Sequence, residues 1–178
     1  MFKGIKEWAF RRCLRRKIKT HKRTKGFFNF NTAKTVGLIF VYEPSVLQAI
    51  KELRAFLKTK RIHCKALSFY LNKEVPIELV DNRYIRYFGK HEVNWYGKCL
   101  SAEANVFIKQ DFDILIDFST KTNPVMHYLT MLSRAKMKLG RLSYPDHPYD
   151  FVLSDGMAAP NIFMKEVKHY LLTIDMKS

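Results

Sequence analysis

Residues 112–142, FDILIDFSTKTNPVMHYLTMLSRAKMKLGRL, contain the pattern that decides the fold. Within this stretch the run 113–118 is almost continuously apolar, which is typical of a strand buried on both faces of a parallel sheet. A polar loop follows, and Pro124 suits the first turn of a helix. The helix has one apolar face, because apolar residues recur at three- and four-residue spacing: Val125, Tyr128, Leu129 and Leu132. Residues 135–142 then return as a short strand, so the stretch predicts a strand-helix-strand unit with a right-handed crossover.

The flanking sequence repeats this alternation. Further strands are expected at 35–42, 63–70, 83–88 and 149–153. Further helices are expected between Pro44 and Leu57, from Ser101 to Gln110, and from Asn161 onward, with Ser101 and Asn161 as N-caps. Five or six strands alternating with four helices predict an α/β fold, a three-layer sandwich with a mostly parallel sheet, Rossmann-like or flavodoxin-like.

Two single residues carry more specific structural expectations. Gly140, in the returning strand, indicates a close approach of another segment or a bulge. Trp95, in the turn NWYGK at 94–98, could stack on a base or sugar. We predict instead that it packs in the core, because tryptophan side chains are highly buried on average.

The first 26 residues are too basic to belong to the core. They hold eleven lysine and arginine residues against one acid, Glu7, a net charge of +10 out of the chain's +16. This composition divides the chain into a basic N-terminal helical extension, residues 1–26, and an α/β domain, residues 27–178. Such an asymmetry of charge favours a polyanionic partner, either nucleic acid or an anionic membrane surface.

Residues 3–25 contain no proline and only Gly4 as a helix breaker, so they predict a helix. Phe10, Leu14 and Ile18 form an apolar stripe with which this helix can dock on a partner, and most of the cations lie on the opposite stripe. Nine cations are predicted to contact phosphates: Arg11, Arg12, Arg15, Arg16, Lys17, Lys19, Lys22, Arg23 and Lys25. Three apolar residues near its start are the candidate anchors on a partner or lipid surface: Phe2, Ile5 and Trp8.

Sequence motifs for catalysis or cofactor binding are weak. The loops after the strands carry neither G-x-G-x-x-G nor a P-loop, and the six histidines lack metal-binding spacing. Acids that follow strands, Glu43, Asp117 and Asp155, are interpreted as helix or loop caps rather than as a metal cluster. We therefore assign no catalytic residues, no metal and no cofactor, and a binding role is favoured over an enzymatic one.

Cysteine usage bears on the compartment. Cys13, Cys64 and Cys99 are odd in number, far apart and without C-x-x-C spacing, which favours a reducing, cytoplasmic location. No apolar run approaches the ~18–20 residues of a spanning helix. The basic start lacks the apolar stretch that a secretory signal needs.

The run FDILIDFS with LTMLSRAKMKLGR resembles the strand-helix-strand unit in the amino-terminal half of heptosyltransferase-like glycosyltransferases. Those enzymes bind their sugar nucleotide mainly through a second Rossmann-like domain, so the resemblance implies the fold rather than the activity. The whole chain, with its basic leader, TVGLIFVY, NWYGK at 94–98 and DILID at 113–117, resembles an uncharacterised family of small basic bacterial proteins.

Three hypotheses follow. The first is a non-catalytic, RNA-binding accessory protein associated with the ribosome, whose partners are ribosomal RNA and ribosomal proteins. Domain cations could extend its RNA-binding surface: Arg83, Arg86, Lys136, Lys138 and Arg141. The second is a peripheral protein of an anionic membrane surface, anchored by the same helix. The third is a reduced glycosyltransferase-like or sugar-nucleotide-binding module.

Overall fold

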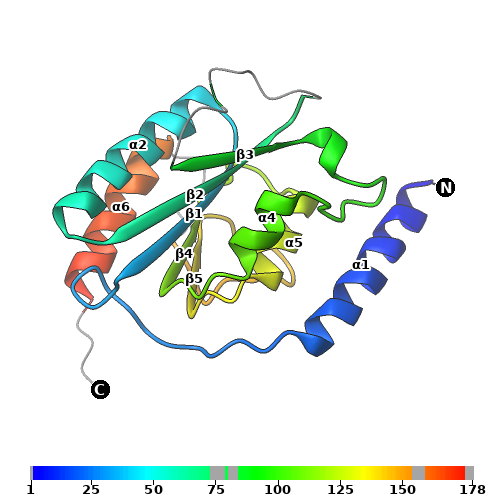
Figure 1. Cartoon of the computed structure of the whole chain (residues 1–178), viewed down its shortest axis with the longest axis horizontal. Helices are drawn as coiled ribbons and strands as arrows, with labels where there is room; N and C mark the ends of the chain where they lie inside the picture. Colours follow the sequence, from blue (N-terminus) through cyan, green and yellow to red (C-terminus); the bar gives the residue numbers. More distant parts are fainter. Residues whose placement is uncertain (1, 73–78, 80–83, 154–158, 175–178) are drawn as a thin grey trace.

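The six strands in the described part of the chain form one parallel sheet, in the order β3-β2-β1-β4-β5-β6 (Figure 1). The computed structural model describes residues 2–72, 79, 84–153 and 159–174. The strands are β1 (Thr35–Val41), β2 (His63–Tyr70), β3 (Ile85–Gly89), β4 (Ile114–Asp117), β5 (Met137–Gly140) and β6 (Phe151–Val152). The predicted three-layer α/β sandwich is confirmed, and the sheet is parallel throughout the described residues.

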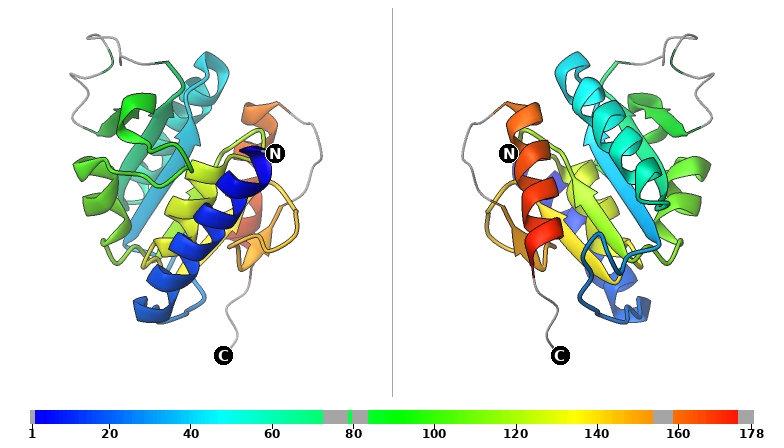
Figure 2. Two further views of the ribbon diagram at one scale, coloured as in Figure 1. Left: turned by 90° about the vertical axis from the view of Figure 1, so that its right-hand side faces the viewer. Right: turned by 90° about the vertical axis from the view of Figure 1, so that its left-hand side faces the viewer.

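Helices cover both faces of the sheet (Figure 2). The helices are α1 (Phe2–Thr20), α2 (Pro44–Thr59), α4 (Ala102–Ile108), α5 (Pro124–Leu132) and α6 (Pro160–Thr173), with a 3₁₀ turn at Lys90–Glu92. Helices α2 and α6 build one core with alternate residues of β1, such as Leu38 and Phe40. Helices α4 and α5 build the other core with the intervening residues, such as Ile39 and Val41.

Local sequence signals set the starts of these helices. Asn123 caps α5, because its side-chain oxygen accepts from the amides of Val125 (2.8 Å) and Met126 (3.3 Å). Ser101 caps α4 as predicted, accepting from the amide of Ala104 at 3.5 Å. The predicted cap at Asn161 is wrong. Helix α6 already begins at Pro160, whose fixed φ suits the first turn, so Asn161 lies inside the helix.

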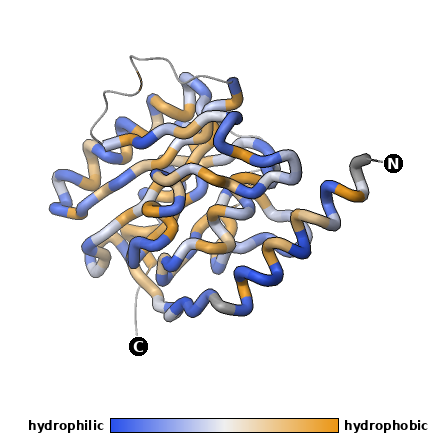
Figure 3. Tube along the Cα trace, turned by 45° about the vertical axis from the view of Figure 1, so that its right-hand side comes forward, coloured by the Kyte–Doolittle hydropathy of each residue, from blue (hydrophilic) through white to orange (hydrophobic). Residues whose placement is uncertain are grey.

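Helix α1 lies outside the sandwich, against α5 (Figures 1 and 2). Its trace is hydrophilic over most of its length, interrupted by single apolar positions (Figure 3). None of the helices in the described part of the chain combines the length and apolar character needed to cross a membrane.

Gly140 allows β5 to approach the loop before β6. A Cβ atom at this position would overlap the ring of Tyr149, which is 9% exposed. The close approach predicted from the sequence is therefore confirmed. It brings the Tyr149 hydroxyl to the end of β4, where it takes part in the cluster described below.

Substituting Gly140→Ala is expected to destabilise the protein by about 1–3 kcal/mol, because the new methyl group overpacks against Tyr149. Urea unfolding followed by circular dichroism measures the change. Gly4→Ala is the matched control, since no atom lies within 4 Å of a Cβ built there. The control should leave stability unchanged or raise it, by up to about 1 kcal/mol. Equal stability of Gly140→Ala and the wild type would contradict the overlap.

Candidate functional site

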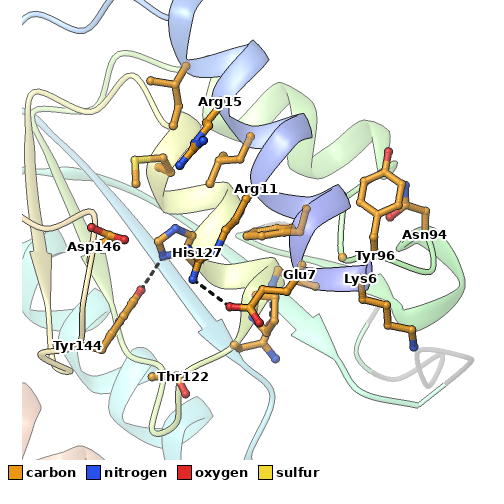
Figure 4. A pocket seen from close by; sticks show the side chains of 18 of the residues that line it. Lys6, Glu7, Arg11, Arg15, Asn94, Tyr96, Thr122, His127, Tyr144 and Asp146 are labelled. Carbon is orange, nitrogen blue, oxygen red and sulfur yellow. Dashed lines mark hydrogen bonds and ion pairs between the residues drawn. The ribbon is translucent and has the colours of Figure 1, made fainter. Parts of the chain in front are cut away.

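A groove of about 860 Å³ runs between α1 and α5. The turn at 94–97 and the loop at 144–146 contribute its remaining walls. Apolar side chains such as Phe10 and Met131 line it beside charged and hydrogen-bonding groups (Figure 4). The polar and charged lining residues are Lys6, Glu7, Arg11, Arg15, Asn94, Thr122, Asn123, His127, Tyr144 and Asp146.

Apolar contacts hold α1 over the groove. Leu14 is buried at 6% exposure, and the ring of Phe10 lies 6.1 Å from that of His127 and 6.3 Å from that of Tyr128. The apolar stripe that was predicted to dock on a partner thus packs on the protein's own α5. Ile18, the third member of that stripe, is 37% exposed and lines the groove.

Arg23 anchors the segment that joins α1 to the sheet. Its guanidinium donates to the carbonyls of Ala135 (2.6 Å) and Lys136 (2.9 Å) and forms a two-point ion pair with Asp150. Burial would raise the pKa of Asp150. Hydrogen bonds from Arg23 and from the amide of Lys138 outweigh burial and hold that pKa below its usual value. Gly26 extends the anchor by donating to the Lys136 carbonyl at 3.1 Å.

A buried lysine lies beside this ion pair. The Nζ atom of Lys138 donates to the carbonyl of Met131 at 3.1 Å, and the residue is 2% exposed. Burial, reinforced by the positive charge of Arg23, lowers the pKa of Lys138 to about 7. A substantial fraction of this lysine is therefore neutral near pH 7, which reduces the cost of burying it.

A chain of polar side chains leads from the end of β4 to the groove. Asp117 accepts from the amide of Ser119 (2.8 Å) and from the hydroxyl of Tyr149 (2.8 Å), and complete burial raises its pKa. The ring of Tyr149 packs edge-on against that of Tyr144, with centroids 6.2 Å apart. The hydroxyl of Tyr144 lies 3.0 Å from Nδ1 of His127. Burial lowers the pKa of His127, so its imidazole is neutral at pH 7.

The point where strand order reverses, between β1 and β4, is where sheets of this kind bind nucleotides. Here the β1–α2 turn holds Glu43, the N-cap residue of α2, whose carboxylate accepts from the Thr120 hydroxyl at 2.8 Å. Pro44 then removes a backbone donor from the start of α2. A carboxylate in place of a glycine-rich turn disfavours a diphosphate at this position.

The predicted nucleic-acid-binding cations separate into groups. Arg12, Arg16 and Lys19 are exposed on α1 away from the groove, whereas Arg11 and Arg15 line the groove. Helix α1 ends at Thr20, so Lys22 and Arg23 do not continue the predicted helical stripe. The other predicted cations have internal contacts: the Nζ of Lys17 lies 5.3 Å from the ring centre of Tyr128, and Arg23 and Lys25 pair with Asp150.

Of the predicted anchors, Ile5 is 51% and Trp8 62% exposed, and the guanidinium of Arg12 lies 5.5 Å from the Trp8 ring centre. The side chain of Phe2 lies outside the described residues.

Two of the domain cations predicted to extend the surface, Lys138 and Arg141, do not reach it. Lys138 lies within the buried strand β5 and is 2% exposed. Arg141 follows that strand and is 4% exposed, with its guanidinium 5.6 Å from the ring centre of Phe163. Lys136 pairs with Asp113 at 2.9 Å, and Arg86 lies 3.7 Å from Glu103. Arg83 and Asp155 lie outside the described residues.

Within the described part of the chain, no three His, Cys, Asp or Glu side chains gather as metal ligands.

The prediction that Trp95 packs in the core is wrong, since 60% of it is exposed. Its turn follows β3 and the 3₁₀ turn at Lys90–Glu92 and is closed by hydrogen bonds between Asn94 and Lys98. Gly97 sits at φ +98°, a conformation that side chains disfavour. The Trp95 ring packs edge-on against Tyr96, with centroids 5.2 Å apart, at the groove wall.

Sequence reasoning missed the groove residues of the domain, chiefly His127, Tyr144 and Asp146. Asp146 takes a positive φ of 60° in the turn before β6, a conformation that Asp tolerates. The only signal for this cluster was the local density of Tyr, His, Pro and Asp at 144–149, directly before the strand expected to begin at Tyr149.

The fold and groove define a parallel α/β protein of the doubly wound type, with a basic N-terminal helix packed over one outer helix. The chain belongs to the family of unknown function DUF6913, which matches residues 6–174. No curated protein and no solved structure matches it significantly.

Replacing Arg23 with glutamine is expected to cost about 3 kcal/mol of unfolding free energy at pH 7, because Asp150 loses its principal partner in a site only 16% exposed. Lys25→Gln is the matched control: its ammonium is 76% exposed, and its pair with Asp150 should contribute under about 1 kcal/mol. Urea unfolding of both variants measures the difference.

The effect of Arg23→Gln on the free energy of unfolding should also depend on pH. The folded pKa of Asp150 lies below its unfolded value of about 3.9, so its stabilising effect is present above that value and is lost as pH falls through the folded pKa. The stability gap between wild type and Arg23→Gln should therefore narrow from pH 7 to pH 3. A gap that stays constant would contradict the assigned ion pair.

Proposed function

We propose that this protein is a non-catalytic RNA-binding accessory protein, and that it contacts RNA phosphates through the outer face of α1. The observation that carries the proposal is that three exposed cations, Arg12, Arg16 and Lys19, lie on one side of a helix whose opposite side is fixed to the domain. A fixed helix presents its charges without the ordering cost that a free tail would incur.

Charge supports RNA as the partner. Arg12, Arg16 and Lys19 form no ion pair within the described residues, so their charges are available to an external anion. Guanidinium groups bind phosphate oxygens at two points and are preferred for this task. Contacts of this kind position a protein on RNA without reading its sequence. Ribosomal RNA, an abundant structured RNA in the cytoplasm, is the proposed target, with neighbouring ribosomal proteins as further contacts.

A triple variant, Arg12→Gln, Arg16→Gln and Lys19→Gln, is expected to weaken binding to a fluorescein-labelled RNA hairpin. Fluorescence anisotropy at several salt concentrations measures the affinity. The slope of log affinity against log salt should fall by about 2–3, since up to three phosphate contacts are lost.

The matched control removes the same charge from the far side of the molecule: Lys51→Gln, Lys58→Gln and Lys165→Gln on α2 and α6. This control should keep the affinity and slope of the wild type. An equal loss in both triple variants would indicate attraction by net charge alone and would contradict the proposed face. Sedimentation with ribosomal particles at low salt, lost in the first variant only, tests the proposed target.

A second candidate is binding to an anionic membrane surface, favoured by the exposure of Ile5 and Trp8 on the same side of α1 as Arg12. An apolar pair beside cations suits the boundary between headgroups and acyl chains. The third hypothesis, a sugar-nucleotide module, lacks comparable support, since Glu43 stands where the diphosphate would bind.

Trp8→Ala separates RNA from membrane binding. If α1 lies in a membrane interface, partition onto vesicles that contain phosphatidylserine should fall about tenfold, because the largest exposed apolar group is lost. Affinity for the RNA hairpin should change by less than about threefold, since the phosphate contacts remain. If the wild type does not bind these vesicles, or if Trp8→Ala binds them as well as the wild type does, membrane binding through α1 is contradicted.

A further inference from the structure

We propose that the groove between α1 and α5 binds one nucleotide unit, with its phosphate on Arg11 and Arg15 and its base against Trp95. This inference rests on the proposed function, because it takes the bound nucleotide to be part of a single-stranded RNA. It assigns a second, inward-facing role to a helix whose outer face contacts structured RNA.

The anionic part of the ligand is matched by the two arginines. Arg11 and Arg15 point from α1 into the groove, and Arg11 extends toward His127 (Figure 4). Within the described residues Arg15 has no ion-pair partner, and Arg11 shares an exposed pair with Glu7 at 2.9 Å. Each guanidinium carries five N–H donors, so Arg11 keeps donors for a phosphate while bound to Glu7.

The polar part of the ligand is matched by acceptors on the opposite wall. Nδ1 of His127 is engaged by Tyr144, and Nε2 has no partner within the described residues. Because the neutral imidazole has one acceptor nitrogen, it can bond a ribose hydroxyl through whichever tautomer Tyr144 selects. Asp146 lines the same wall and accepts hydrogen bonds only. Its negative charge disfavours phosphate at that wall and leaves the arginine side for it. Glu7 lies on α1 beside the arginines, where its charge is paired with Arg11.

The aromatic part of the ligand is matched by Trp95. This side chain is 60% exposed at the groove, on a turn that its own hydrogen bonds and Gly97 hold in shape. An exposed indole on a braced turn is a stacking surface for a base, and stacking tolerates any sequence. The groove's 860 Å³ falls within the range of about 300–1,000 Å³ typical of small-ligand sites.

A combination of guanidinium donors, hydrogen-bonding groups on the opposite wall and an exposed aromatic ring selects a nucleotide over other anions. A fatty acid would leave the acceptors unpaired, and an acidic peptide would bring carboxylates to Asp146. A nucleotide places its single phosphate, its hydroxyls and its base on three separate parts of the groove.

Trp95 also supplies the measurement. The chain contains two tryptophans, Trp8 and Trp95, so Trp8→Phe leaves Trp95 as the sole indole fluorophore. Saturable quenching of this variant by a short single-stranded oligouridylate and by UMP reports on the groove. We expect the oligonucleotide to bind tighter than UMP, because RNA carries further phosphates to the cations of α1.

Variants of the groove are tested with a labelled oligouridylate by anisotropy. Arg15→Gln and Trp95→Ala should each weaken binding about tenfold or more, whereas Trp95→Phe should restore most of the affinity because it keeps an aromatic face. Lys165→Gln, on α6, is the matched control for the loss of one charge and should bind like the wild type.

The outcomes separate the two proposals. Hairpin binding that depends on Arg12, Arg16 and Lys19 without quenching of Trp95 would overturn the groove and leave the proposed function standing. Quenching by UMP as strong as by oligouridylate would support a nucleotide site but overturn RNA as its source. Equal binding by Trp95→Ala and the wild type would overturn base stacking.

Discussion

The two faces of a parallel sheet are both apolar and must both be covered. The helices that connect one parallel strand to the next supply that cover. In this protein α2 and α6 meet that requirement on one face, and α4 and α5 on the other. The short α5 then presents an outer surface in which Tyr128 and His127 lie under α1. The groove exists because a helix of 19 residues lies against one of nine and overhangs the neighbouring loops.

The position of α1 depends on a charge that the domain buries at β5. Asp150 uses both oxygens, accepting from Arg23 and from the backbone of Lys138. Burying a carboxylate and a guanidinium offers little net stability compared with apolar packing. The contribution of the Arg23–Asp150 ion pair is to fix the position of the segment that follows α1. Arg23 also binds two successive carbonyls, Ala135 and Lys136, which fixes the segment against the residues just before β5. The pKa of Lys138, lowered to about 7, leaves part of this lysine neutral near pH 7 and so reduces the buried positive charge at this site.

Features that depend on neighbouring residues in the sequence could be predicted. Contacts that depend on the order of the strands in the sheet could not. The run 113–118 and the cap residues before α4 and α5 specify their elements within a few positions. Arg23, by contrast, finds its partner 127 residues away, and Tyr149 reaches Asp117 across 32. Composition cannot show that one cation of a basic run is buried. The prediction for Trp95 was wrong because the average burial of tryptophan does not apply to one on an exposed turn.

Helix α1 would be a poor helix by itself. Like charges at three- and four-residue spacing repel one another, and its first turn lacks an acid to interact with the helix dipole. Contacts at Phe10, Leu14 and Lys17 with α5 offset that repulsion on the inner side, while the outer cations still repel. A bound polyanion would remove the outer repulsion without disturbing the inner contacts. Binding of the proposed ligands would therefore be coupled to the stability of α1 through the same charges, and an anion on either face would strengthen the helix that presents the other.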